Sequence, residues 1–192
     1  MARTANNHSE YLQGQLLIAM PSMGDPRFER TVIYMCAHSA DGAMGLVINK
    51  PLEAITFPDL LRQLGIDTPA AGQSILVHAG GPVEPGRGFV LHSDDYQHDG
   101  SMRLGDNMML TATIDVLKAM AGGHGPQRSL LALGYAGWEP GQLDAEIQAN
   151  GWLTVPGDPE IIFEAELDQK WSRAVRKVGI DLAQLSSSAG HA

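Results

Sequence analysis

The stretch that most constrains the fold is residues 76–93, which read LVHAGGPVEPGRGFVLHS. It places four glycines and two prolines between two apolar runs. Glycine reaches backbone conformations that other residues avoid, and proline fixes φ, so the chain must turn sharply here. The flanking runs, SILVH (74–78) and GFVLHS (88–93), are therefore predicted to be strands that pair around a shaped hairpin loop.

Similar turn signals divide the rest of the chain into short elements. Strands are predicted at 15–19, 31–37, 45–49, 108–112 and 129–138, where β-branched and other apolar residues cluster. Helices are predicted at 56–65, 113–121, 140–150 and about 168–178, with Thr56 and Thr113 as N-caps of the first two. Strands and helices do not alternate as in a doubly wound fold, so the predicted class is α+β, a mixed sheet with helices packed on it.

The 192 residues are predicted to form a single compact domain. Both ends of the chain are rich in small and polar residues. Residues 1–10 are predicted to be a disordered N-terminal segment and 186–192 a flexible tail, which leaves 11–185 as the folded domain.

Charge and cysteine content exclude several classes of protein. The net charge of −9 disfavours nucleic-acid binding, which depends on lysines and arginines that displace counterions. A single cysteine, Cys36, excludes an internal disulfide and a multi-cysteine metal site. The sequence shows no signal peptide and no apolar run of about 18 residues. We therefore expect a cytoplasmic protein without membrane contact, and nothing in the sequence indicates its oligomeric state.

The 76–93 stretch has the glycine spacing of a phosphate-binding loop but not its chemistry. Gly81 and Gly86 are separated as in G-x-x-x-x-G, yet Arg87 replaces the lysine and Gly88 the hydroxyl residue. A strand rather than a helix follows, so this reading fails. A narrower hypothesis is that the amides of Gly80 and Gly81 form an anion-binding nest beside Arg87.

Other polar groups each allow a functional and a structural interpretation. Asn49 and Lys50 end a strand before Pro51 and could hold a ligand, although Pro51 can simply terminate pairing. The candidate ligand-binding residues are Asn49, Lys50, Gly80, Gly81, Arg87, Gly88 and His92. The cluster of His92, Asp94, Asp95, His98 and Asp99 could bind a metal, but it matches no metal motif, so a polar loop is favoured. No metal and no cofactor is predicted.

Three further clusters have a favoured structural interpretation. Cys36 and His38 could form a nucleophilic pair, but a lone cysteine in an apolar strand is favoured as a buried residue. Lys170, Arg173 and Lys177 could bind DNA or an acidic partner, but they are favoured as the solvated face of the last helix. The loop that holds Asp25, Arg27, Glu29 and Arg30 is predicted to be a solvated, ion-paired turn.

Five segments resemble the YqgE/AlgH family of bacterial proteins and span about residues 14–192. They are GQLLIAMPSMGDPRFERTVIY, GAMGLVINKPL, GGPVEPGRGFVLHS, LGYAGWEPGQLDAEIQANGWL and GIDLAQLSSSAGHA. The resemblance implies a single α+β domain with a mixed, partly barrel-like sheet, no established activity, and a transcriptional-regulator label on one branch. The family's recurrent positions fall here on Asn49, Lys50, Pro51, Gly81, Pro82, Val83, Arg87, Gly88, His92, Gly134, Tyr135 and Trp138.

Three functions follow from these observations, in order of preference. The first is a cytoplasmic, non-enzymatic regulatory or binding module that acts through a protein partner or a small anionic ligand. The second is a hydrolase or transferase with a site near Arg87, His92 and the carboxylates of 94–99. The third is a regulator that binds DNA directly, for which the sequence shows no helix-turn-helix signature.

Overall fold

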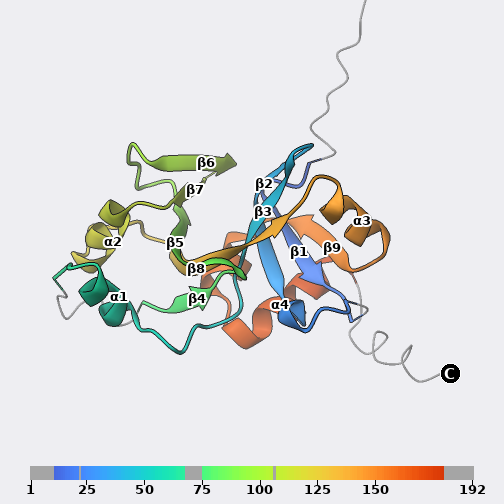
Figure 1. The fold of residues 1–192 in the computed structure, drawn as a ribbon, viewed down its shortest axis with the longest axis horizontal. Helices are drawn as coiled ribbons and strands as arrows, with labels where there is room; N and C mark the ends of the chain where they lie inside the picture. Colours follow the sequence, from blue (N-terminus) through green and yellow to red (C-terminus); the bar gives the residue numbers. More distant parts are fainter. Residues whose placement is uncertain (1–10, 22, 68–74, 106, 180–192) are drawn as a thin grey trace, which may run out of the picture.

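The computed structural model describes residues 11–21, 23–67, 75–105 and 107–179. Residues 1–10 and 186–192, predicted to be disordered and flexible, lie outside this part of the chain. The described residues form one nine-stranded sheet with helices packed around it (Figure 1). The predicted α+β class is confirmed.

Most strands and the α-helices lie close to their predicted positions, but no strand was predicted at Ser101–Gly105, and the strand predicted at 88–93 begins at Val83. The strands are β1 (Gln15–Ala19), β2 (Val32–Ser39), β3 (Gly42–Val47), β4 (Val77–Ala79), β5 (Val83–Ser93), β6 (Ser101–Gly105), β7 (Met108–Thr111), β8 (Ser129–Trp138) and β9 (Trp152–Pro156). The α-helices are α1 (Phe57–Gln63), α2 (Ile114–Ala121), α3 (Gln142–Gln148) and α4 (Leu167–Lys177). A 3-10 turn at Pro26–Phe28 and a π-helical turn at Glu160–Glu164 complete the set.

The sheet runs in the order β6-β7-β5-β8-β3-β2-β1-β9, and β4 adds to β8 outside this path. The first half of β8 pairs with β4 and β5, and its end pairs with β3. In Figure 1, β8 therefore passes from the half of the molecule that holds β4–β7 to the half that holds β1–β3 and β9. The sheet curls around this strand into a half-barrel.

The predicted hairpin of the two strands around the glycine stretch is wrong. Val77 of β4 pairs in parallel with Leu131 of β8, and Val90 of β5 pairs with the same residue antiparallel from the other edge. β8 thus lies between them. A buried apolar strand needs a partner on each edge for its backbone hydrogen bonds, and the glycine stretch carries the chain across β8 to provide both.

Where the chain crosses β8, the backbones meet without room for side chains. A Cβ atom on Gly81 would lie 2.1 Å from the carbonyl carbon of Tyr135, and one on Gly134 would lie 2.4 Å from the Gly81 oxygen. Gly134 also has a φ of +77°, which favours glycine. We call Gly80, Gly81 and Gly134 the glycine crossing.

In the glycine crossing, both the amide and the carbonyl of Gly80 form backbone hydrogen bonds. Its amide donates to the Leu133 carbonyl at 2.8 Å, and its carbonyl accepts from the Val47 amide at 2.9 Å. The predicted anion nest is therefore wrong for Gly80, because its N–H is not available to a ligand.

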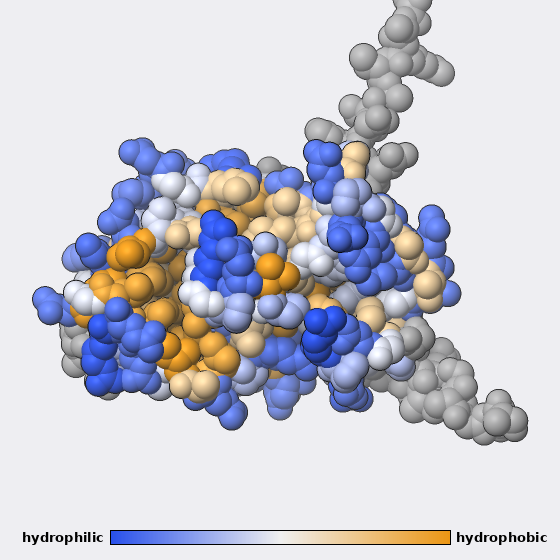
Figure 2. All heavy atoms as spheres, viewed as in Figure 1, coloured by the Kyte–Doolittle hydropathy of each residue, from blue (hydrophilic) through white to orange (hydrophobic). Residues whose placement is uncertain are grey.

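The helices cover the sheet with side chains at helical spacing. α4 buries Trp171, Ala174 and Val175 against β1 and β2. α1 and α2 cover the β4–β5 half, where apolar side chains gather at the surface in Figure 2. Thr56 is the N-cap of α1, as predicted, and forms a reciprocal capping box with Asp59. Thr113 precedes α2 as predicted, but its side chain makes no capping hydrogen bond.

The glycine crossing leads to a stability prediction. Gly81→Ala should lower the free energy of unfolding by about 3 kcal/mol or more, because the methyl group overlaps the Tyr135 backbone and φ at this residue is positive. A Cβ atom on Gly86, in the same stretch, would have no atom within 4 Å. Gly86→Ala should therefore change the free energy of unfolding by less than about 0.5 kcal/mol. Urea unfolding of both variants measures the difference; equal effects would contradict the close crossing.

Candidate functional site

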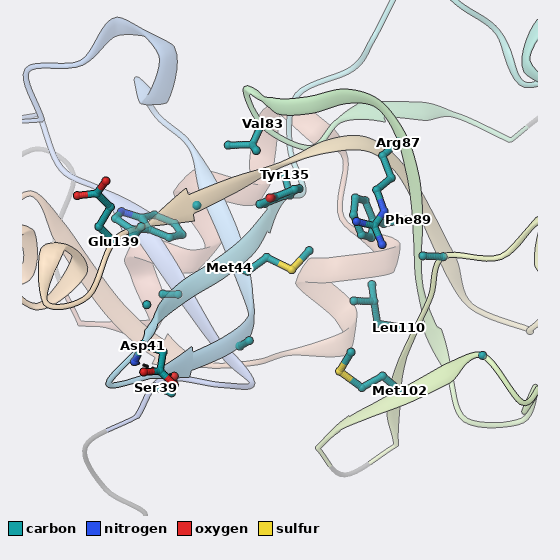
Figure 3. A pocket seen from close by; sticks show the side chains of 17 residues that line it. Ser39, Asp41, Met44, Val83, Arg87, Phe89, Met102, Leu110, Tyr135 and Glu139 are labelled. Carbon is teal, nitrogen blue, oxygen red and sulfur yellow. Dashed lines mark hydrogen bonds between the residues drawn. The ribbon is translucent and has the colours of Figure 1, made fainter.

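A concave groove opens where β8 leaves β5 and joins β3. Its volume is about 780 Å³. One wall comes from the β2–β3 hairpin and the end of β8, and the other comes from β5, β6 and β7 (Figure 3). The side chains that fill its middle are apolar or aromatic: Met44, Val83, Phe89, Met102, Leu110 and Tyr135.

These side chains come from strands far apart in the sequence. Figure 3 shows Met44 from β3 extending toward Phe89 and Leu110 across the groove. Phe89 and Tyr135 pack edge to face with their ring centroids 5.8 Å apart. Methionine is flexible and polarisable, so Met44 and Met102 can adapt to an apolar ligand.

The two ends of the groove carry opposite charges. Arg87 lies at one end with its guanidinium over the Phe89 ring, 5.1 Å from the centroid. Its carboxylate partner, Glu84, is 3.5 Å away, and both side chains are more than half exposed, so this pair contributes little. Asp41 and Glu139 line the opposite side (Figure 3). The groove therefore has one basic and one acidic end.

Only part of the predicted site lies in this groove. Arg87 lines it, whereas Gly88 pairs with Leu133 and faces a separate narrow cleft of about 110 Å³ beside α1 and α2. Tyr135 and Val83, two of the family's recurrent positions, also line the groove. No local pattern groups Tyr135 and Val83 with Met44 and Met102, because only the bend of β8 brings these side chains together.

His92 is buried on the other face of β5. Alternation along the strand places Arg87 and Phe89 on one face and Val90 and His92 on the other. The His92 Nδ1–H donates to the Ser93 carbonyl at 2.8 Å, so Nε2 accepts from the Thr111 hydroxyl at 2.7 Å. Burial lowers the pKa of His92. Arg87 and His92 therefore do not form the joint site of the enzyme hypothesis.

The polar residues after His92 hold their own loop together. Asp95 accepts from the Ser93 hydroxyl and from the Gln127 amide at 2.9 Å, and the Ser93 bond lowers its pKa. Asp94 lies 3.7 Å from Arg103, and His98 lies 3.6 Å from Asp115. Among the residues that the structure describes, no three histidine, cysteine or acidic side chains are placed to hold a metal ion.

Cys36 and His38 do not form a nucleophilic pair. Cys36 is the extra residue of a β-bulge between Met35 and Ala37, and burial raises the pKa of its thiol to about 12. His38 instead accepts from the Leu12 amide at 3.0 Å. The interpretation of Cys36 as a buried core residue agrees with the structure.

Asn49 and Lys50 hold the turn that precedes β2. The Asn49 side chain accepts from the Val32 amide at 2.9 Å and donates to the Arg30 carbonyl at 2.8 Å. The Lys50 ammonium donates to the Glu29 carbonyl at 2.8 Å. Both predicted ligand-binding residues thus make backbone contacts that fix the neighbouring loop.

The ion-paired turn is confirmed for one of its arginines. Arg27 pairs with Asp25 at 2.6 Å. Arg30 makes no ion pair within the described residues and lies over the Trp171 ring, 5.0 Å from its centroid. Arg30, Lys50 and Trp171 line a hollow of about 430 Å³, which we call the Arg30 pocket.

Lys170 is buried, so its assignment to a solvated helix face is wrong. Its ammonium donates to the carbonyls of Ile48 at 2.9 Å and Ile162 at 2.7 Å, and burial lowers its pKa to about 8. Arg173 and Lys177 do face outward and lie near acidic side chains. One signal was available: Lys170 lies four residues before the buried Ala174, on the same helix face.

Lys170 and His78 line a further hollow of about 600 Å³. His78 Nδ1 donates to the Leu131 carbonyl at 2.9 Å. Burial, helped by the nearby Lys170 charge, lowers the pKa of His78 to about 4. Sequence reasoning did not single out His78, and it placed Lys170 on a different, solvated surface.

Comparison with known proteins identifies the family. A family profile described as AlgH-like matches residues 16–183. The chain belongs to the AlgH-like family. Among curated AlgH-like relatives, a UPF0301 protein of Rhodospirillum rubrum is 55% identical, with 100% of both chains covered. One of Bradyrhizobium diazoefficiens is 56% identical over 95% of this chain and 89% of the relative.

Solved structures agree with this AlgH-like assignment. The solution structure of AlgH from Pseudomonas aeruginosa matches with a TM-score of 0.79 and 43% identity, covering 100% of both chains. A Corynebacterium diphtheriae protein matches in fold, with a TM-score of 0.73, 21% identity, and 97% and 94% of the two chains covered. The resemblance predicted from the sequence is confirmed.

Burial of His78 predicts sensitivity of the fold to acid. The pKa of His78 is about 4 in the folded state and near 6.5 when unfolded, so only the unfolded chain takes up this proton between these pH values. From pH 6.5 to 4, the wild type should therefore lose about 3 kcal/mol more unfolding free energy than His78→Gln. Urea unfolding at each pH measures this loss.

His124→Gln is the control, because His124 is exposed. It should keep the wild-type pH dependence. An unchanged pH dependence in His78→Gln would show that burial of this imidazole does not cause the acid sensitivity.

Proposed function

We propose that this AlgH-like protein is a non-enzymatic binding module of the cytoplasm that holds a small amphipathic anion in the concave groove. The apolar part of the ligand would lie between Met44, Phe89 and Leu110, and its anionic group would contact Arg87. The observation that carries the proposal is the position of Arg87, an exposed guanidinium stacked on the aromatic wall of an otherwise apolar groove.

The size and lining of the groove suit a small molecule. Small-molecule sites typically have volumes of roughly 300–1,000 Å³, mainly apolar walls and a few polar groups that orient the ligand. The groove has about 780 Å³, an apolar middle and charged groups at its ends. A protein segment is the alternative occupant, but the limited volume and the single basic group favour a compact ligand.

The charges of the groove favour one orientation of an anion. A guanidinium can form two parallel hydrogen bonds to a carboxylate, which are stronger than those between neutral groups. The exposed Glu84 contact is long enough to be displaced at little cost. Asp41 and Glu139 would repel the anionic group from the other end, so it should lie at Arg87.

The other two functions receive less support from the geometry. The enzyme hypothesis needs Arg87 and His92 in one site, but they lie on opposite faces of β5. The DNA hypothesis needs a basic surface, but Arg173 and Lys177 of α4 lie within 3.9 Å and 2.8 Å of carboxylates. Of the described helices, none is long and apolar enough to cross a bilayer.

Binding of decanoate tests the proposal. The uncharged apolar dye Nile red should bind the wild type in the groove, and decanoate should displace it more strongly than uncharged decanol. Arg87→Ala should weaken decanoate binding about tenfold, because one charge-assisted contact worth about 1.5 kcal/mol is lost. Fluorescence titration measures both ligands.

Arg103→Ala is the matched control. It removes the same charge from strand β6, where Arg103 lies near Asp94 and does not line the groove. Binding of decanoate to this variant should remain at the wild-type level. Equal weakening in both variants, or equal binding of decanol and decanoate, would contradict a specific role for Arg87.

A further inference from the structure

We infer that the Arg30 pocket binds the phosphate group of a small phosphorylated molecule. This site is separate from the concave groove, with which it shares no lining residue. It lies where the turn before β2, the end of β3 and the start of α4 meet.

The first argument is that neighbouring residues hold Arg30 in place. Asn49 and Lys50 bond to the backbone of the turn on either side of it, at Glu29, Arg30 and Val32. Arg30 itself has a φ of +50°, a conformation that costs a non-glycine residue free energy. The surrounding hydrogen bonds maintain this conformation and aim the side chain over Trp171.

The second argument is the charge left available in the pocket. Neither Arg30 nor Lys50 has a carboxylate within 4 Å among the described residues, whereas Arg27 in the same turn is paired with Asp25. The chain as a whole has 22 acidic and 13 basic residues. Two cations without acidic partners therefore share one concave wall of an acidic protein, which suits an anion.

The third argument concerns the kind of anion. Asp168 also lines the pocket, so the two cations exceed the local negative charge by one. A phosphate monoester carries about −1.5 to −2 at pH 7 and is attracted more strongly than a monocarboxylate. The Arg30 guanidinium can bind two of its oxygens in parallel, while the Lys50 ammonium adds a point charge.

The remaining lining can accommodate the rest of the molecule. Pro51 and Leu167 provide apolar surface, and Asp168 and Ser172 can bond to hydroxyl groups. The volume of about 430 Å³ leaves space beside a phosphate group. The exposed acidic side chains of Glu160, Glu164 and Glu166 precede α4 and would repel a polyanion, which favours a small molecule over a nucleic acid.

Nuclear magnetic resonance of the tryptophan indoles tests this site. The Trp171 Nε1–H donates to the Ala19 carbonyl beneath the pocket, and Trp138 and Trp152 both donate to Glu146 elsewhere and serve as internal references. Inorganic phosphate and ribose 5-phosphate, added separately at constant ionic strength, should shift the Trp171 signal along a saturable curve. Acetate should bind at least tenfold more weakly.

The variants separate a specific site from general charge attraction. Arg30→Ala should weaken phosphate binding at least tenfold, and Arg30→Lys should weaken it several-fold, because the charge is kept but the planar fork is lost. Arg27→Ala removes the same charge three residues away and should bind as the wild type does. The reference indole signals of each variant report whether it is folded.

Three results would overturn the inference. One is no saturable shift of Trp171 with either phosphate probe. Another is equal weakening in Arg30→Ala and Arg27→Ala. The third is displacement of ribose 5-phosphate by a single-stranded oligonucleotide at a comparable phosphate concentration, which would assign the pocket to a nucleic-acid backbone.

Discussion

The fold depends on a place where two backbones touch without side chains between them. At the glycine crossing, Gly80 and Gly81 pass over Gly134, and each Cβ atom that is missing would overlap a backbone atom. This contact lets β8 take β4 and β5 as partners and then continue to β3. The two halves of the sheet are joined through this one strand (Figure 1).

The concave groove is a consequence of the same geometry. Beyond Tyr135, β8 turns from β5 to β3, and the space between the diverging strands is lined by side chains of both halves. Arg87 reaches this space because β5 continues along the crossing, with Val83 opposite Tyr135. The glycines and the arginine of the 76–93 stretch therefore have separate roles: the glycines form the crossing, and Arg87 supplies charge to the groove.

The sequence predicted the elements well and their assembly less well. Apolar periodicity and turn residues located β8 at 129–138 and α4 to within one residue, because these are local properties. The partners of β8 depend on contacts between distant segments, so the hairpin prediction failed. Lys170 was misplaced because a charged residue usually indicates solvent, whereas here two backbone carbonyls from other segments bind its ammonium.

The central claim is that the curled sheet forms one ligand site from both of its halves. Met44 and Met102 line opposite walls of the groove, so their methyl groups report on it directly. In a methyl-labelled sample titrated with decanoate, we predict that the Met44 and Met102 signals shift together with one dissociation constant, while the signal of Met120 in α2 does not shift. Unchanged Met44 and Met102 signals at saturating decanoate, or a shift confined to Met120, would contradict the account.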